Sequence, residues 1–177
     1  MTVYSLFAAI LDYPKQSIAR LVDDCLTELA GEAPDASAQL AEFQTAIAQK
    51  SLSQLQEIYT SAFDLRPDCT PNLGYHVFGD DARRGVFLAA LKERMEACGM
   101  DLGVELPDHI AFILQYLDLA EEERPVVIED CLLPSLTKML EVLKDGTNPY
   151  EHALRALLTL LRHQHERFVV PAEAIEV

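Results

Sequence analysis

Histidine side chains are the first candidates in this sequence for binding a metal ion. His152, His163 and His165 fall in one segment with helical apolar spacing. At about 100° per residue, His165 lies about 200° round such a helix from His163. The three imidazoles therefore cannot converge on one ion from a single helix.

The four cysteines are spread along the chain, and no two of them form a C-x-x-C pair that could bind zinc or carry out redox chemistry. Cys25, Cys98 and Cys131 lie among apolar residues and are expected to be buried thiols. The sequence also has no H-E-x-x-H motif, no phosphate-binding glycine loop and no G-x-S-x-G elbow. It therefore predicts no metal site, no cofactor and no catalytic residue, so the protein is not expected to be an enzyme.

Polar residues instead gather in two segments between helices, residues 64–84 and 105–109. Several of them have a plain structural explanation: Asp80 as a helix N-cap, Pro107 at a helix start, and Asp108 in a first helical turn, where the dipole favours a carboxylate. Two such segments, in a chain otherwise patterned for packing, favour a binding surface.

The net charge narrows the class of partner. The chain has 29 Asp and Glu against 14 Lys and Arg, a formal net charge of -15. Such a surface repels phosphate backbones and anionic membranes but attracts a basic peptide, although acidity can also serve solubility alone. The N-terminal run VYSLFAAIL is short and has no preceding basic region, so it is predicted to be neither a signal peptide nor a membrane span. A cytoplasmic location is expected.

The elements that hold these segments are helices. Apolar residues recur at helical spacing over residues 3–11, over 18–29 after Pro14 has opened the helix, over 35–49, and from an N-cap at Ser51 to Phe63. Residues 64–79, DLRPDCTPNLGYHVFG, have no sustained period and are expected to form a long, functional loop.

The second half continues in the same way. Asp80 or Asp81 is expected to cap a helix that ends at Gly99, residues 110–117 form another, and residues 125–145 form a helix kinked or split at Pro134. Asn148 and Pro149 begin the last helix. The predicted fold is an all-α, single-domain bundle of about seven to nine helices with a long central loop, spanning residues 1–177, with 168–177 as a flexible tail.

Four motifs occur in an order that resembles a known family. They are LDYP at 11–14, YTSAFDL at 59–65 followed by Pro67, G-D-x-x-R-R-G at 79–85, and ELPDH at 105–109. Their order and spacing resemble the NarJ-type nitrate reductase delta subunits, which belong with the TorD-like redox enzyme maturation chaperones. The resemblance covers roughly residues 4–161.

The resemblance implies an all-helical cytoplasmic chaperone. Its partner would be the catalytic subunit of a molybdopterin oxidoreductase, bound by its twin-arginine-like or remnant N-terminal signal peptide until the molybdopterin and iron-sulfur centres are inserted. Cofactor-insertion proteins are a further implied partner. Nitrate reductase is the first client to consider, but CTPNLGYHVFG at 69–79 departs from that type and leaves other members of the dimethyl sulfoxide reductase family as alternatives.

The same resemblance implies that residues 75–85 and ELPDH line the peptide groove, with apolar walls and a carboxylate rim complementary to a basic amphipathic peptide. The expected peptide-binding residues are Tyr59, Phe63, Asp64, Tyr75, His76, Asp80, Arg83, Arg84, Glu105, Pro107, Asp108 and His109.

Two other classes of protein stay open from the residues alone. An acidic all-α domain without catalytic motifs could be an adaptor or regulator that docks a partner helix unrelated to molybdenum enzymes. A metal- or nucleotide-dependent enzyme would need a ligand set or phosphate loop that the sequence does not contain.

Overall fold

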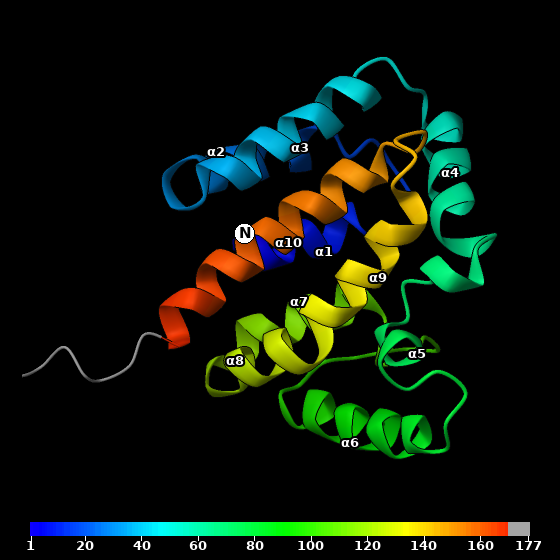
Figure 1. The fold of residues 1–177 in the computed structure, drawn as a ribbon, viewed down its shortest axis with the longest axis vertical. Helices are drawn as coiled ribbons and strands as arrows, with labels where there is room; N and C mark the ends of the chain where they lie inside the picture. The colour runs from blue at the N-terminus through cyan, green and yellow to red at the C-terminus, as the bar shows by residue number, and fades with distance from the viewer. Residues whose placement is uncertain (170–177) are drawn as a thin grey trace, which may run out of the picture.

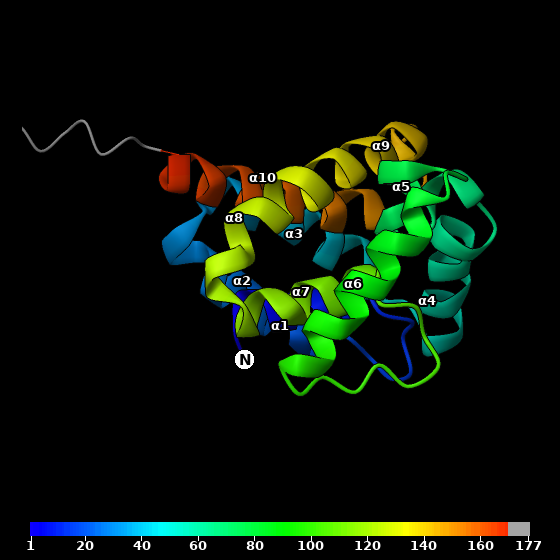
Figure 2. The same cartoon turned by 90° about the horizontal axis from the view of Figure 1, so that it is seen from below.

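The computed structural model describes residues 1–169, and helices dominate that range (Figures 1 and 2). In chain order the elements are α1 (Val3–Ile10), α2 (Ala19–Glu32), α3 (Pro34–Ile47), α4 (Leu52–Tyr59), the π-helical turn η1 (Thr60–Asp64), the 3-10 turn η2 (Pro67–Cys69), α5 (Leu73–Phe78), α6 (Arg83–Ala97), α7 (Ile110–Leu119), the 3-10 turn η3 (Glu121–Glu123), α8 (Arg124–Val127), the π-helical turn η4 (Ile128–Leu132), α9 (Leu133–Leu143) and α10 (Tyr150–Val169). Within these residues the extended pairing is limited to an isolated bridge between Asn72 and His109. The predicted all-α fold is confirmed.

The last helix, α10, lies at the centre of the bundle. It packs against α3 on one side and α9 on the other, while α1 packs against α7 and α2 (Figure 1). Leu154, Leu157 and Leu161 of α10 are inaccessible to solvent and form the middle of the apolar core. Helix α6 lies at the periphery, with its main contacts to α5 (Figure 2). Over residues 1–169 no helix combines the length and apolar character needed to cross a bilayer.

Two of the predicted helix starts are confirmed by their capping bonds. The hydroxyl of Ser51 accepts a bond from the Gln54 N–H at 3.3 Å, and the Gln54 side chain accepts one from the Ser51 N–H at 2.9 Å, which is a complete capping box. Asn148 Oδ1 accepts from the Tyr150 N–H at 3.0 Å.

The prediction that Pro14 opens the second helix is wrong, because α2 begins at Ala19. A proline fixes φ suitably for a first turn without enforcing a helix after it, and here the chain bends.

The prediction of a long loop over residues 64–79 is also wrong. That segment begins at the last residue of η1 and contains η2 and the six-residue helix α5. A helix of six residues spans fewer than two turns and cannot display a 3.6-residue period. Gly74 lies inside α5, where a Cβ atom would come within 2.7 Å of Asp108 Oδ2. The missing side chain at Gly74 therefore lets the α5 backbone lie close to the Asp108 carboxylate, and does not serve to make a turn.

The break expected near Pro134 is confirmed, since the π-helical turn η4 separates α8 from α9 and Pro134 lies in the first turn of α9.

The expectation that Cys98 is buried is wrong. Cys98 lies one residue beyond the end of α6, past the buried stripe of Leu91 and Met95, and is exposed. Of the tail expected at 168–177, the first two residues belong to α10, and residues 170–177 lie outside the described part of the chain.

Candidate functional site

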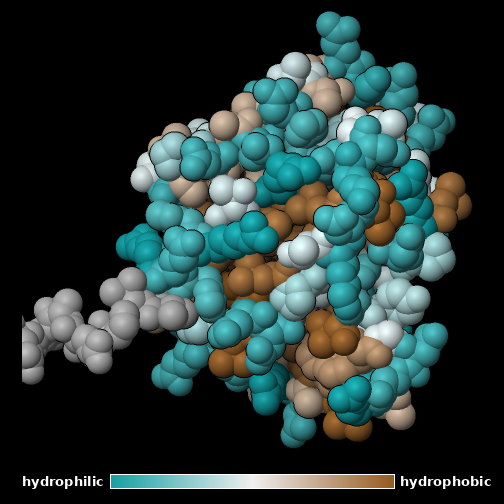
Figure 3. All heavy atoms as spheres, in the orientation of Figure 1, coloured by the Kyte–Doolittle hydropathy of each residue, from teal (hydrophilic) through white to brown (hydrophobic). Residues whose placement is uncertain are grey.

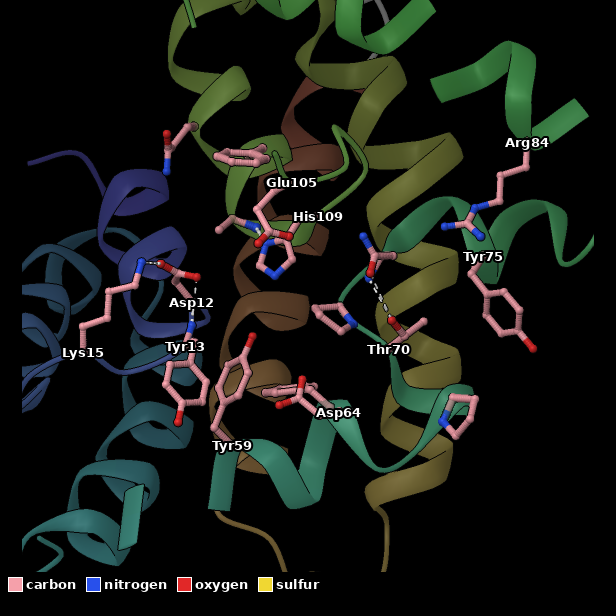
Figure 4. A pocket seen from close by; sticks show the side chains of 17 residues that line it. Asp12, Tyr13, Lys15, Tyr59, Asp64, Thr70, Tyr75, Arg84, Glu105 and His109 are labelled. Atoms are coloured by element: carbon pink, nitrogen blue, oxygen red, sulfur yellow. Dashed lines mark hydrogen bonds and ion pairs between the residues drawn. The ribbon is translucent and has the colours of Figure 1, made fainter. Parts of the chain in front are cut away.

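A cavity of about 930 Å³ opens where five parts of the chain meet. These parts are the turn after α1, the end of α4 with η1, the segment from η2 into α5, the start of α6, and residues 105–115, which lead into α7. Figure 4 shows aromatic, carboxylate and imidazole side chains pointing into this pocket from its several walls. The lining residues are Asp12, Tyr13, Lys15, Tyr59, Phe63, Asp64, Pro67, Thr70, Pro71, Asn72, Tyr75, Arg84, Glu105, His109, Ala111, Phe112 and Gln115.

The pocket brings together more than half of the residues expected from the sequence. Those that line it are Tyr59, Phe63, Asp64, Tyr75, Arg84, Glu105 and His109. Those that do not are His76, Asp80, Arg83, Pro107 and Asp108. The two segments 64–84 and 105–109 therefore meet in space, but only some of their side chains face the same hollow.

Residues from the turn after α1 were missed. Asp12, Tyr13 and Lys15 line the pocket, and they form part of or adjoin the LDYP motif, which was the available signal. The motif contributes to the family resemblance, but none of its residues was among those expected to bind the peptide. Phe112 and Gln115, on the first turns of α7, were missed because helical periodicity alone does not separate a pocket face from a core face.

Aromatic rings form one wall of the pocket. The Tyr59 ring lies edge-on to Phe63 at a centroid distance of 4.8 Å and to Tyr13 at 5.4 Å, a geometry that aligns ring edges with ring faces. The Tyr59 hydroxyl is directed at the Leu11 carbonyl, 3.4 Å away. Tyr59 and Phe63 are almost fully buried, whereas Tyr13 is 40% exposed. Tyr13 is therefore the ring of this wall that an incoming ligand would touch.

The π-helical turn η1 determines how Phe63 and Asp64 are presented. Residues 60–64 continue α4 with one wide turn, and such turns are rare and frequently occur at functional sites. The Asp64 carboxylate accepts a hydrogen bond from the Thr60 hydroxyl at 3.1 Å and is otherwise exposed. The wide turn thus places a buried ring and an exposed carboxylate side by side on the same wall.

A short backbone bridge joins the two polar segments. The Leu73 N–H donates to the Asp108 carbonyl at 2.8 Å, and the Ile110 N–H donates to the Pro71 carbonyl at 2.8 Å. These bonds fix the start of α5 against the start of α7. These bonds hold the two polar segments together, although Asn72 and Asp108 are 36 residues apart in the sequence.

Asp108 lies behind the pocket wall rather than in it. Its side chain is fully buried, where Oδ2 accepts from Arg84 Nη2 and Oδ1 from Asn72 Nδ2, both at 3.0 Å. The expectation that Pro107 starts the next helix and Asp108 occupies its first turn is wrong, because α7 begins at Ile110. The Arg84 guanidinium in turn lies 5.9 Å from the centre of the Tyr75 ring. Asp108 therefore holds Arg84, which does line the pocket, in place.

His109 is the N-cap of α7 and also lines the pocket. Its Nδ1 accepts a hydrogen bond from the Ala111 N–H at 3.3 Å, so the neutral ring carries its proton on Nε2. Burial lowers the pKa of His109 below its ordinary value, and the nearby carboxylates of Asp12, Glu105, Asp108 and Asp64 only partly oppose this. At neutral pH the ring is therefore uncharged, with Nε2 as a hydrogen-bond donor.

The remaining expected residues lie elsewhere. His76 is buried, and its Nε2 donates to the Thr70 carbonyl at 2.7 Å, so it stiffens the segment before α5. Burial lowers its pKa as well. Asp80 and Arg83 are exposed outside the pocket. The N-cap position of α6 is Ala82 rather than Asp80, and the side chain that bonds the start of the helix is that of Asp81, whose Oδ1 accepts from the Arg83 N–H at 2.8 Å.

The charges in the pocket are unevenly matched. Asp12 is 3.5 Å from Lys15, and Arg84 is paired with Asp108, so these charges are neutralised locally. In the described part of the chain, neither Asp64 nor Glu105 has a cation within ion-pair distance. The pocket thus presents two unneutralised carboxylates next to an aromatic wall, an arrangement that attracts a cationic side chain. Among residues 1–169 no group of three or more His, Cys, Asp and Glu is placed to hold a metal ion.

Comparison with known proteins agrees with the motifs. Residues 28–163 match the family described as nitrate reductase delta subunit. The chain is also similar to a protein of Bacillus subtilis (strain 168) named "Probable nitrate reductase molybdenum cofactor assembly chaperone NarJ", with 25% identity over 163 residues, covering 90% of this chain and 88% of the relative. The family match takes in more than half of the chain and includes η1, α5 and the ELPDH segment. This chain therefore belongs to the nitrate reductase delta subunit family.

Proposed function

We propose that this protein is a cytoplasmic assembly chaperone, without catalytic activity of its own, for a molybdopterin oxidoreductase. Its client would be the catalytic subunit, and nitrate reductase is the first candidate because both the matched family and the similar Bacillus subtilis protein carry that name. The chaperone binds the N-terminal signal peptide or signal-peptide remnant of the client and holds the subunit while the molybdenum cofactor is inserted.

The observation that carries this proposal is the composition of the pocket. A basic amphipathic peptide needs apolar surface for one face and carboxylates for the other. The pocket offers the partly exposed Tyr13 ring, the Phe112 ring from α7 and the unneutralised carboxylates of Asp64 and Glu105. With a net charge of -15 the whole protein also steers a cationic peptide toward itself.

The test is binding of a synthetic peptide that carries the client's N-terminal residues. Asp64→Asn with Glu105→Gln should weaken binding, because it removes the two charges that lack a cation in the pocket. Both carboxylates are exposed, so each contributes about 0.2–1 kcal/mol and the double variant should lose about two- to thirtyfold in affinity. Wild-type affinity should fall as salt is added, since exposed charges are screened over about 8 Å at physiological ionic strength.

A matched control removes the same number of charges elsewhere. Asp24 and Glu42 are exposed on α2 and α3 and do not line the pocket, so Asp24→Asn with Glu42→Gln should bind like the wild type at moderate salt. If both double variants lose affinity equally, the pocket is not the peptide site. If no client peptide binds the wild type, while an unrelated basic helix does, the protein is an adaptor for another partner and the proposal fails.

A further inference from the structure

A second hollow, distinct from the pocket, lies between α6 and α8. It has a volume of about 280 Å³ and shares no lining residue with the pocket. Its walls are mainly apolar and come from α5, α6, α7 and α8, with Phe78, Phe87, Ala90, Ile113 and Val127 among the lining residues. We call this hollow the α6–α8 groove.

The apolar walls of the groove are not fully covered by the fold. Val126 is 60% exposed, Ala90 is exposed, and Phe78 and Phe87 are half-buried. Figure 3 shows apolar side chains gathered beside α6 in the lower part of the view. Contiguous apolar surface that a protein leaves open is commonly an interaction site. Ligand pockets have volumes of about 300–1,000 Å³, so the groove suits one or two anchoring side chains rather than a whole small molecule.

The charges around the groove indicate what kind of partner it fits. Residues 121–130, EEERPVVIED, flank the groove with five carboxylates and one arginine. Glu123 forms an ion pair with Arg94 across the groove at 3.0 Å, and Glu121 pairs with Arg124 at 3.3 Å. In the described residues, Glu122 and Asp130 have no cationic partner, and Asp130 lines the groove. One side of an apolar groove is thus acidic.

We infer that the α6–α8 groove docks a helix of a partner protein, a helix that is apolar on one face and carries Lys or Arg along one flank. Apolar residues spaced by three or four positions would enter the groove between Phe87 and Val127, and the basic flank would face Glu122 and Asp130. The groove and the pocket are separate sites, because the first turns of α6 lie between them. Arg84 of this helix lines the pocket, whereas Phe87 lines the groove.

The experiment uses a defined probe, a fluorescently labelled amphipathic peptide of leucine and lysine about 14 residues long, roughly four helical turns. Binding is measured by anisotropy in the Asp64→Asn, Glu105→Gln background, so that the pocket contributes little. Ala90→Phe fills the groove and should weaken binding by about tenfold or more. Ala89→Phe is the matched control, because Ala89 is exposed on the same helix but does not line the groove, and it should bind like its parent.

Two further arms test the chemistry of the site. Glu122→Gln with Asp130→Asn should weaken binding of the probe by a few-fold, because an exposed charge contributes little to affinity. This variant tests the groove even if Ala90→Phe does not fold normally. A peptide of leucine and glutamate with the same spacing, and a leucine and lysine peptide of scrambled order, should both bind at least about tenfold more weakly than the probe.

The inference is overturned if Ala90→Phe binds as tightly as Ala89→Phe, or if the scrambled peptide binds like the probe. It is also overturned if the parent self-associates in sedimentation velocity and Ala90→Phe makes it monomeric, because the groove then holds a second copy of this chain. None of these results bears on the pocket, since every arm starts from protein in which the pocket carboxylates are already neutralised. Failure here leaves the proposed chaperone function standing.

Discussion

The guanidinium of Arg84 and the carboxylate of Asp108 form an ion pair at 3.0 Å, in which the Asp108 side chain is fully buried and the Arg84 side chain is 25% exposed. The pair joins the first turn of α6 to the segment before α7, and Asn72 adds a second bond to the same carboxylate. Asp108 is thus a structural anchor of the pocket wall, and any ligand in the pocket would meet Arg84 rather than Asp108.

Removing one partner of this pair should be costly. Asp108→Ala leaves the Arg84 guanidinium and the Asn72 amide without their acceptor, and breaking a buried pair in this way costs about 3–5 kcal/mol of unfolding free energy. Arg84→Met combined with Asp108→Asn leaves no charge behind, and a side-chain oxygen remains for Asn72, so this double variant should recover more than half of the loss. Urea denaturation of the wild type and of each variant measures these changes in the free energy of unfolding. Equal stability of Asp108→Ala and the wild type would show that the carboxylate is not an anchor.

Gly74 should resist substitution because of its neighbours and not because of its backbone. A Cβ at this position would lie 2.7 Å from Asp108 Oδ2 and 3.2 Å from the Phe87 ring, so Gly74→Ala must shift α5 or α6 and should cost about 1–3 kcal/mol. Gly85 also lies in a helix but has no heavy atom within 4 Å of the corresponding position. Gly85→Ala should therefore stabilise by about 0.5–1 kcal/mol. Melting curves that show the same sign for both variants would contradict the crowding seen at Gly74.

His109 should make stability depend on pH. Burial lowers the pKa of His109 in the folded protein, while in the unfolded chain it is about 6.5. Below that value the unfolded state takes up a proton that the folded state resists, so stability is full above about pH 6.5 and is lost as the pH falls toward the folded pKa. His76, also with a lowered pKa, adds to the same trend.

Two substitutions separate the proton from the cap. His109→Asn keeps a side-chain acceptor for the Ala111 N–H but does not titrate, so the loss of stability between about pH 7.5 and pH 5.5 should become smaller. His109→Ala removes the cap and should cost about 1 kcal/mol even at the higher pH. Denaturation at several pH values checks both. An unchanged pH slope in His109→Asn would assign the effect to His76 or to other groups.

The four thiols should differ sharply in reactivity. Burial raises the pKa of Cys25, Cys69 and Cys131 to about 12 in each case, so almost none of the reactive thiolate is present near pH 8. Cys98 is exposed. A maleimide should therefore label one thiol per folded chain, and Cys98→Ser should abolish that label, as counted by mass spectrometry. Rapid labelling of a second cysteine under native conditions would show that the core opens locally.

Much of the fold was predictable from the sequence because long amphipathic helices repeat their apolar residues many times. The stripes of α2 and α10 extend over several turns, and Ser51 and Asn148 are side chains that cap helices by local bonds. Helix α5 was not predictable in this way. It is short, contains Gly74, and is held by the backbone bridge to Asp108 and Ile110, which is a tertiary interaction.

The site was predictable only in part for the same reason. Motif order identified the segments that meet, but it could not show which side chain of a pair faces the hollow. Asp108 and His109 are adjacent, yet one is fully buried behind the wall and the other lines the pocket. The Asn72–His109 bridge sets this alternation. Tyr13 and Lys15 enter the pocket from a bend whose direction no local pattern specifies.

The central position of α10 has a consequence for how this protein is made. Residues 150–169 are among the last of the described part to be synthesised, yet they cover the apolar faces of both α3 and α9. While the ribosome is still adding them, at about 5–20 residues per second, those faces lack the cover of α10, and the core that α1, α2, α3 and α7 begin to form is incomplete. A nascent chain that ends before α10 therefore remains open to proteases and to aggregation. The bundle can therefore close around its complete core only after α10 has left the ribosome.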